Sequence, residues 1–180
     1  LVAIDYGIAS LQYTQQLQAL ALEIDKPLEL RLQNLKPGTR YFYRLLFQNS
    51  ASKQWTATPE YEFQTAKQAG QPFVFAIQGD SHPERLKTQF DADLYKRTLL
   101  RAAADKPDFY ILSGDDFSVD TLNPATITAS QVRERYTLQR PYLTLMGRTS
   151  PLFLVNGNHE QAARYLLDGT PNNVAVWAQN

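Results

Sequence analysis

Three short apolar runs, each of which stops at a polar loop that contains a glycine, constrain the fold of this chain most. They span Phe73–Ile77, Phe109–Leu112 and Leu152–Val155. Near-continuous apolar runs of this length are typical of strands that are buried on both faces of a parallel or mixed sheet. Two longer stretches rich in helix-forming residues, 85–105 and 130–146, separate the runs. Because strand and helix signals alternate in this way, the sequence predicts an α/β domain.

The two intervening stretches carry helix signals of their own. In the first stretch, Leu86, Phe90 and Leu94 recur at i, i+4 and i+8, which is the spacing of one helix face. In the second stretch, Ser130 is expected to cap the N-terminus. Proline lacks a backbone N–H, so Pro141 is expected to break this helix or to start a second helical piece.

The first third of the chain shows the period-two alternation of half-buried strands. Apolar and polar residues alternate over 28–33, and again over 41–47 and 61–65. Between the first two of these segments, Pro37 supplies a fixed φ and Gly38 a permissive one, which favours a turn. The pattern therefore predicts an antiparallel β-module.

Tyr41 follows this turn directly and resembles the tyrosine corner of Greek-key β-sandwiches, in which the hydroxyl bonds to nearby backbone. On these features, residues 1–66 resemble the later strands of a fibronectin type III-like domain. A complete module takes about 100 residues, so we expect a partial β-sandwich, with a small self-sufficient β-meander as the alternative. The polar segment 67–72 contains glycine and proline and is expected to be a linker.

The composition removes several classes of site. The chain of 180 residues has no cysteine, which excludes disulfide frameworks, thiolate zinc sites and cysteine nucleophiles. Its 18 basic residues balance its 18 acidic ones, which argues against nucleic-acid binding through bulk positive charge. No run approaches the roughly 18 apolar residues that a membrane span requires. The only histidines are His82 and His159, so a metal site within the chain must also use carboxylates and amides.

The loops that follow the three apolar runs carry metal-ligand residue types. Their sequences are Gly79-Asp80-Ser81-His82, Gly114-Asp115-Asp116 and Asn156-Gly157-Asn158-His159-Glu160. Each loop taken alone reads as an ordinary turn or helix cap. In an open α/β sheet, however, ligands bind beyond the carboxyl ends of the strands, and both histidines of the chain fall in these loops. Together the three loops predict a metal site.

These loops resemble the sequence blocks of the calcineurin-like metallophosphoesterases. The first block is Asp80-Ser81-His82, the second is Gly114-Asp115 with its lead-in from Phe109, and the third is Gly157-Asn158-His159-Glu160. The resemblance is strongest to the purple acid phosphatase branch, whose members carry a fibronectin-like domain ahead of the catalytic one. It implies that residues 73–180 are the N-terminal part of an α/β (α+β sandwich) metallophosphoesterase domain, incomplete at its C-terminus.

The resemblance also implies roles for individual residues. Asp80 and His82 would bind a first metal, Asp115 would bridge two metals, and Asn158 would bind the second. His159 would act on the leaving group as an acid or as a transition-state stabiliser. The implied activity is hydrolysis of phosphate esters by two iron, manganese or zinc ions, with a metal-bound hydroxide as the nucleophile. The family further implies a secreted or periplasmic location.

Three departures from the family pattern bear on these expectations. Ser118 stands where purple acid phosphatases place a tyrosine, and His82 stands where they usually have glycine. We therefore expect no tyrosinate-to-iron colour and an imidazole on the first metal. No histidine follows His159, whereas the family has two later histidine blocks. Either the second metal site has been lost or the sequence stops before it, and the partial β-module favours the latter.

Two alternatives of other classes stay open. A non-catalytic binding or adhesion protein could keep the metallophosphoesterase fold and bind its partner through the β-module. The absence of the later histidine blocks and the many aromatic residues agree with this alternative. A single-metal or nucleotide-binding domain is the weaker alternative, because the chain has no glycine-rich phosphate loop of either common type. The sequence leaves the oligomeric state open.

Overall fold

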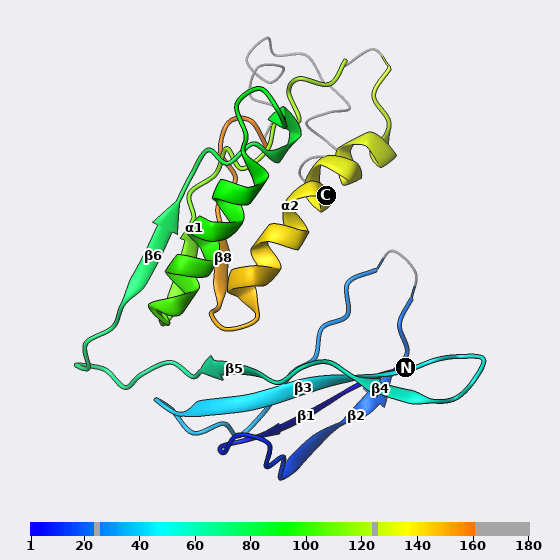
Figure 1. Cartoon of the computed structure of the whole chain (residues 1–180), viewed down its shortest axis with the longest axis vertical. Helices are drawn as coiled ribbons and strands as arrows, with labels where there is room; N and C mark the ends of the chain where they lie inside the picture. Colours follow the sequence, from blue (N-terminus) through cyan, green and yellow to red (C-terminus); the bar gives the residue numbers. More distant parts are fainter. Residues whose placement is uncertain (24–25, 124–125, 161–180) are drawn as a thin grey trace. The chain divides into compact units, whose positions relative to one another are not determined.

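The chain divides into two compact units in a computed structural model, which describes residues 1–23, 26–123 and 126–160 (Figure 1). The first unit comprises Leu1–Phe73 and the second Val74–Asn180. The last part of the predicted catalytic segment, residues 161–180, lies outside the described residues.

The first unit is built on one antiparallel sheet. Its strand order is β2-β1-β3-β4, and β5 also pairs with β3. The predicted strands over 41–47 and 61–65 are confirmed as β3 and β5, whereas β2 and β4 were not expected from their weak alternation. The strands are β1 (Val2–Gly7), β2 (Gln15–Leu20), β3 (Arg40–Gln48), β4 (Trp55–Ala57) and β5 (Tyr61–Gln64).

The prediction of a strand over residues 28–33 is wrong. Leu28, Leu30 and Leu32 are half-buried and the residues between them are exposed, so the alternation does describe which side chains are covered. No strand forms there, however. Strands β2, β4 and β5 each pair along one edge, and residues 28–33 pair with none of them. An alternating pattern reports side-chain burial, but a strand also requires backbone hydrogen bonds to a neighbouring strand.

The hydrogen bond expected of Tyr41 is confirmed. Its hydroxyl accepts a hydrogen bond from the backbone N–H of Lys36 at 2.9 Å, and its ring stacks on Phe63 with centroids 5.6 Å apart. The intervening turn uses Gly38 at a φ of +60°, and the N–H of this glycine donates to the carbonyl of Ala66. The turn and the tyrosine thus fix the start of β3 against the end of the unit.

The second unit contains a parallel sheet in the order β6-β7-β8. The three apolar runs are confirmed as strands: Phe109–Leu112 keeps its predicted bounds, and the other two differ at their ends by one or two residues. Two long helices and one short one connect them, which gives the predicted alternation. The elements are β6 (Phe75–Gln78), η1 (Pro83–Arg85), α1 (Ala92–Ala104), β7 (Phe109–Leu112), α2 (Ala129–Gly147) and β8 (Leu152–Leu154).

Helices α1 and α2 cover one face of this sheet (Figure 1). Leu99 and Met146 from the helices pack with Tyr110 and Leu112 of β7, and all four are almost completely buried. The opposite face carries Phe75, Ile77 and Phe153, which are 50%, 61% and 56% exposed. Within the described residues, the expectation that these strands are buried on both faces is therefore wrong.

The helix boundaries differ from the sequence-based expectation at their N-termini. Helix α1 begins at Ala92 because the carboxylate of Asp91 accepts hydrogen bonds from the first-turn backbone, and Leu86 and Leu94 are about half exposed. Helix α2 is capped by Thr128 in a capping box with Gln131, not by Ser130.

The expectation that Pro141 breaks α2 is also wrong. The helix runs without interruption from Ala129 to Gly147 with this proline inside it. Gln139 and Met146, on either side of the proline, are both buried, so tertiary packing compensates for the one backbone hydrogen bond that proline removes.

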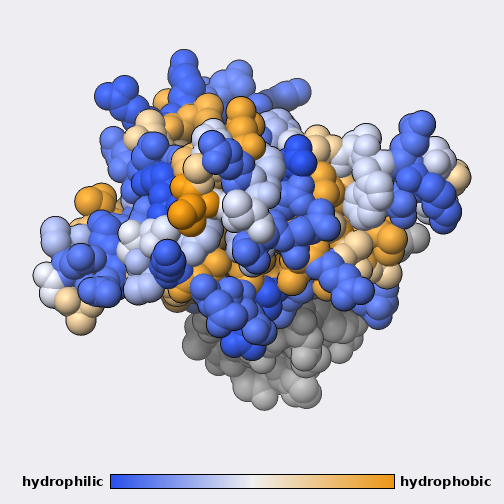
Figure 2. Space-filling view, turned by 90° about the horizontal axis from the view of Figure 1, so that it is seen from below, coloured by the Kyte–Doolittle hydropathy of each residue, from blue (hydrophilic) through white to orange (hydrophobic). Residues whose placement is uncertain are grey.

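The surface is mixed in polarity. Hydrophobic patches lie between larger hydrophilic areas on the face shown in Figure 2, in line with a mean hydropathy of −0.40. Among the described residues, no helix is both long enough and apolar enough to cross a membrane.

Candidate metal and phosphate site

The three predicted loops meet at the carboxyl ends of β6, β7 and β8. Backbone hydrogen bonds join them directly: Asp80 N–H donates to the Gly114 carbonyl at 3.2 Å, and His82 N–H donates to the Asp116 carbonyl at 2.9 Å. The third loop is tied in by the Val119 N–H, which donates to the His159 carbonyl at 3.1 Å. The parallel register places these loops side by side, and their own backbones then hold them together.

Two glycines allow the second and third loops to approach this closely. A Cβ on Gly114 would lie 2.3 Å from the backbone nitrogen of Gly157, and Gly114 also has a φ of +97°. A Cβ on Gly157 would lie 2.3 Å from Oδ1 of Asp115. Since real Cβ atoms do not come this close to other atoms, both positions require glycine.

Three of the predicted site residues are among the eight non-glycine residues with a left-handed backbone in the described part of the chain. Asp80, His82 and Asp115 have φ values of 54°, 49° and 56°, in the left-handed region that non-glycine residues rarely adopt. Each such residue costs of the order of 1–3 kcal/mol and persists only where the surroundings fix it. Strained residues of this kind cluster at functional sites.

The imidazole of His82 is oriented through one of its nitrogens. Nδ1 lies 3.0 Å from Oε1 of Glu84 and 3.2 Å from the hydroxyl of Ser118. Because an ionised carboxylate only accepts hydrogen bonds, Nδ1 carries the proton, and in the neutral ring the lone pair is on Nε2. Nε2 lies 3.9 Å from Oδ1 of Asp80. A ligating histidine typically has its second nitrogen bound to a carboxylate in this way.

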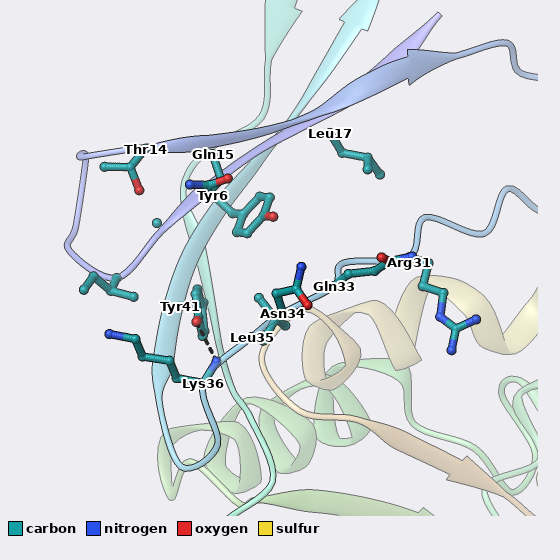
Figure 3. A pocket seen from close by; sticks show the side chains of 12 residues that line it. Tyr6, Thr14, Gln15, Leu17, Arg31, Gln33, Asn34, Leu35, Lys36 and Tyr41 are labelled. Atoms are coloured by element: carbon teal, nitrogen blue, oxygen red, sulfur yellow. Dashed lines mark hydrogen bonds between the residues drawn. The ribbon is translucent and has the colours of Figure 1, made fainter.

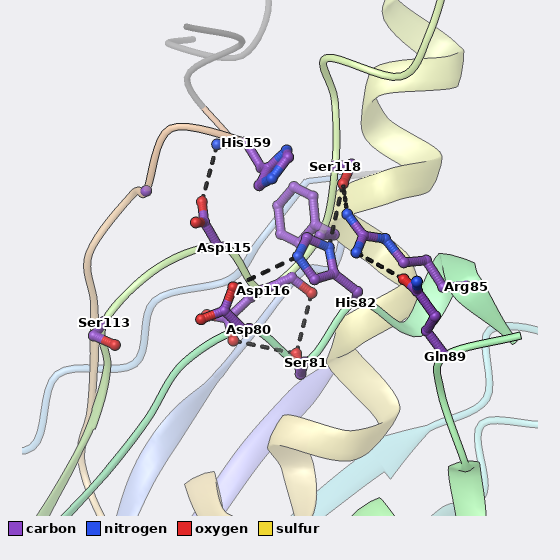
Figure 4. A network of polar contacts seen from close by, with 12 residues as sticks. Asp80, Ser81, His82, Arg85, Gln89, Ser113, Asp115, Asp116, Ser118 and His159 are labelled. Atoms are coloured by element: carbon purple, nitrogen blue, oxygen red, sulfur yellow. Dashed lines mark hydrogen bonds and ion pairs between the residues drawn. The ribbon is translucent and has the colours of Figure 1, made fainter.

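His159 lies against His82 and is oriented by two aspartates. The two imidazole rings meet edge to face with centroids 5.1 Å apart, as Figure 4 shows. The backbone N–H of His159 donates to Oδ1 of Asp115 at 3.0 Å, and its Nδ1 lies 2.9 Å from Oδ1 of Asp120. The hydrogen bond to Asp120 is the largest cause that raises the pKa of His159 above its usual value. Nε2 is therefore the nitrogen that can exchange a proton with a ligand.

Replacing Asp120 with asparagine is expected to lower the pKa of His159. The amide oxygen can still accept the hydrogen bond from Nδ1, but the negative charge that favours the imidazolium is lost. The pH titration of the His159 ring protons by NMR, in metal-free protein, measures this change. Asp93→Asn on the exposed surface of α1 is the matched control. An unchanged titration in Asp120→Asn would contradict the orienting role of this carboxylate.

Glu160 is a residue of the site to which the sequence interpretation gave no role. It is 2% exposed, and its two carboxylate oxygens accept four backbone hydrogen bonds. Oε2 accepts from Asp115 and Gly157, and Oε1 accepts from Asp116 and Phe117. The glutamate therefore clamps the second loop to the third. Its position directly after His159 was the one sequence feature that could have indicated a role at the site. Its four hydrogen bonds, however, follow only from the tertiary structure.

Asp116, which follows the predicted bridging aspartate, faces the interior. Its Oδ1 accepts hydrogen bonds from the side chains of Gln78 at 3.0 Å, Gln139 at 3.1 Å and Ser81 at 3.2 Å. Burial away from water raises the pKa of Asp116 to about 6, and Glu160 nearby adds to this effect. Of the two adjacent aspartates, Asp115 therefore lies at the site, and Asp116 lies in a buried hydrogen-bond network.

Asp116 is expected to make the stability of the metal-free protein depend on pH. The pKa of Asp116 is about 6 in the folded protein and about 4 in the unfolded chain. Between about pH 4 and pH 6, its carboxyl group is therefore protonated in the folded state and ionised in the unfolded state. The free energy of unfolding should then fall as the pH rises from about 4 to 6. Asp116→Asn should lack this component, which urea unfolding in the presence of a chelator measures. Parallel pH profiles of the two proteins would contradict the raised pKa.

The predicted ligands lie in neighbouring loops, but they do not converge on one point. Oδ1 of Asp80 lies 3.9 Å from Nε2 of His82, while Asp115 belongs to the next loop and accepts a hydrogen bond from the His159 backbone. Asn158 is exposed in the same turn as His159. Among the described residues, no three histidine or acidic side chains form a group that could hold a metal ion.

The donor set nevertheless fits a metal in its chemistry. Asp80 is 78% exposed at its side chain, His82 presents an oriented Nε2, and carboxylate and imidazole suit iron, manganese and zinc. One oxygen of the buried Glu84, Oε2, has no hydrogen-bond partner within the described part of the chain. This oxygen lies beside His82 and is free to accept a further interaction, although Arg85 lies 3.7 Å from the other oxygen, Oε1.

Two pockets differ in the chemistry that they offer. A pocket of about 390 Å³ between β6 and α1 is lined by Asp80, Ser81 and Gln89, so it adjoins the strand ends. A pocket of about 660 Å³ in the first unit lies between the sheet and the segment around Arg31 and Leu35 (Figure 3). Its lining contains no aspartate, glutamate or histidine. Of these two pockets, only the one between β6 and α1 is lined by carboxylates.

No protein-family model matches this chain, and no curated protein matches it significantly.

Proposed function

We propose that the second unit is part of a metal-dependent phosphoester hydrolase of the calcineurin-like type, similar to the purple acid phosphatase branch. The proposal includes the first unit as a partial fibronectin type III-like module. One observation carries it: loops from three successive parallel strands, joined by backbone hydrogen bonds, bring Asp80, His82, Asp115 and His159 close together, with the two imidazole rings in edge-to-face contact.

The proposed metal ligands divide between two ions. Asp80 and His82 would hold the first ion, Asp115 would bridge the pair, and Asn158 would hold the second. When bound, such ions act as Lewis acids on a phosphoryl oxygen and lower the pKa of a coordinated water towards neutrality. Glu84 supports this arrangement because it fixes the His82 ring through Nδ1 and leaves Nε2 for a ligand.

His159 is proposed to hold the proton that the leaving group needs. Its hydrogen bond to Asp120 favours the imidazolium, so Nε2 can donate to the oxygen on which charge develops when the phosphorus–oxygen bond breaks. The N–H of its own backbone binds Asp115, which keeps this proton donor next to the proposed bridging ligand. Positioning and charge stabilisation of this kind are most of what phosphoryl transfer requires.

Metal analysis and an ester-hydrolysis assay test the proposal on the full-length protein. We expect it to bind transition metal and, once loaded with iron, manganese or zinc, to release p-nitrophenol from p-nitrophenyl phosphate. Removing the metal with a chelator should abolish the activity, and adding it back should restore it. A metal-loaded protein that cleaves neither monoesters nor diesters would contradict the proposal. A folded protein that binds no metal would instead support the non-catalytic binding role.

A further inference from the structure

Arg85 is the only arginine or lysine in the three loop segments 79–86, 113–120 and 156–160. The same segments contain six acidic residues, at positions 80, 84, 115, 116, 120 and 160. A phosphate monoester brings up to two further negative charges to such a site. The position of the single fixed cation is therefore important for which anions can bind.

The guanidinium of Arg85 is oriented by neutral partners. Nη1 donates to Oε1 of Gln89 at 3.0 Å, and Nη2 donates to the Ser118 hydroxyl at 3.2 Å. Figure 4 shows the side chain reaching from the short helix η1 towards Ser118 and the ring of His82. These two bonds fix the plane of the guanidinium without neutralising its charge, and they leave N–H groups on both terminal nitrogens.

Arg85 contacts two residues that orient His82, because Ser118 and Glu84 both lie against Nδ1 of that ring. Its one acidic neighbour, Glu84, lies 3.7 Å from Nε and is already bound to His82 and to the backbone N–H of Ser118. The side chain is 32% exposed, and its partner Gln89 lines the pocket beside Asp80. Arg85 is thus open to a ligand at this edge of the site.

We infer that Arg85 binds a non-bridging phosphoryl oxygen and makes the site selective for phosphate monoesters over diesters; this rests on the proposed function. A guanidinium presents parallel N–H groups that match two oxygens of one phosphate. A monoester offers three non-bridging oxygens and up to two charges, whereas a diester offers two oxygens and one charge. An arginine in an acidic site therefore favours the monoester.

The test compares wild-type, Arg85→Gln and Arg85→Lys full-length protein on p-nitrophenyl phosphate and bis(p-nitrophenyl) phosphate. Arg85→Gln should raise the KM for the monoester, and the inhibition constant of inorganic phosphate, about tenfold or more. Its kcat/KM for the diester should change less than about threefold. Arg85→Lys keeps the positive charge but loses the paired N–H groups of the guanidinium. Its KM for the monoester should therefore lie between the values of the wild type and Arg85→Gln. Arg101→Gln, at an exposed position of α1, is the matched control.

The outcomes separate the inference from the proposed function. Equal losses on both esters, or no loss on either, would overturn the role of Arg85 while leaving the hydrolase assignment intact. If Arg85→Gln lowers the midpoint of unfolding, the test rests on Arg85→Lys. A purely structural role of Arg85 predicts the wild-type ratio of monoester to diester activity in this variant, whereas a role in phosphate binding predicts a lower ratio. Wild-type protein that hydrolyses neither ester would contradict the proposed function, and the Arg85 inference with it.

Discussion

Replacing Glu160 with glutamine is expected to lower the free energy of unfolding of the second unit by about 3–6 kcal/mol. The buried carboxylate accepts hydrogen bonds from four backbone N–H groups, two on each oxygen. Glutamine replaces one of these oxygens with an NH₂ group, which cannot accept, so two N–H groups lose their partner. Hydrogen bonds to a charged group contribute about 1.5–3 kcal/mol each, and the loss of two gives the stated range. Urea unfolding followed by circular dichroism measures it.

The control for this substitution is Glu134→Gln. Glu134 is exposed on α2, and surface substitutions usually change stability by less than about 0.5 kcal/mol. Because Glu160 joins the loops of Asp115 and Gly157, its replacement should also weaken any metal binding at the site. Equal stabilities of Glu160→Gln and Glu134→Gln would show that the clamp does not hold the loops together.

Replacing Asp115 with asparagine is expected to reduce metal retention and phosphoester turnover together, by about 100-fold or more. Loss of an outer-shell partner of a metal ligand already costs about 10–100-fold, and Asp115 is proposed as a ligand to both ions. The asparagine oxygen can still accept the hydrogen bond from His159, so the loop should keep its conformation while the charge is lost. Metal analysis after dialysis and p-nitrophenyl phosphate hydrolysis measure the two effects.

Asp93→Asn serves as the matched control for Asp115→Asn. Its side chain is 87% exposed on α1, and the substitution should change neither metal content nor turnover. Asp115→Ala should give at least the same loss as the asparagine variant. If the Asp115→Asn protein keeps both its metal and its activity, Asp115 does not bridge the two ions.

Much of the second unit could be predicted because its signals are local. The apolar run at Phe109–Leu112 ends where the strand ends, and the glycines that follow the strands mark the places where the backbone must turn. The hydrogen bond of the Tyr41 hydroxyl could be predicted for the same reason, because its partner Lys36 is only five residues away. Signals of this kind depend on the intrinsic preferences of a few consecutive residues.

Expectations failed where a distant part of the chain decides the result. The alternation over 28–33 predicted a strand, but this segment pairs with none of the strands of the sheet. Pro141 predicted a break, but packing on both sides keeps α2 continuous. Burial of both faces was expected of the strands, yet Ile77 and Phe153 on one face are exposed in the described residues.

The residue types that can carry chemistry in this protein follow from the sequence alone. With no cysteine and two histidines, the available groups are the carboxylates, amide and imidazoles that follow the three strands. Their orientation follows from the tertiary structure. Glu84 and Asp120 fix the two imidazole rings, and Glu160 holds two loops whose residues lie more than 40 positions apart. Orientation depends on hydrogen bonds between distant segments, and these exist only once the parallel strands have brought their ends together.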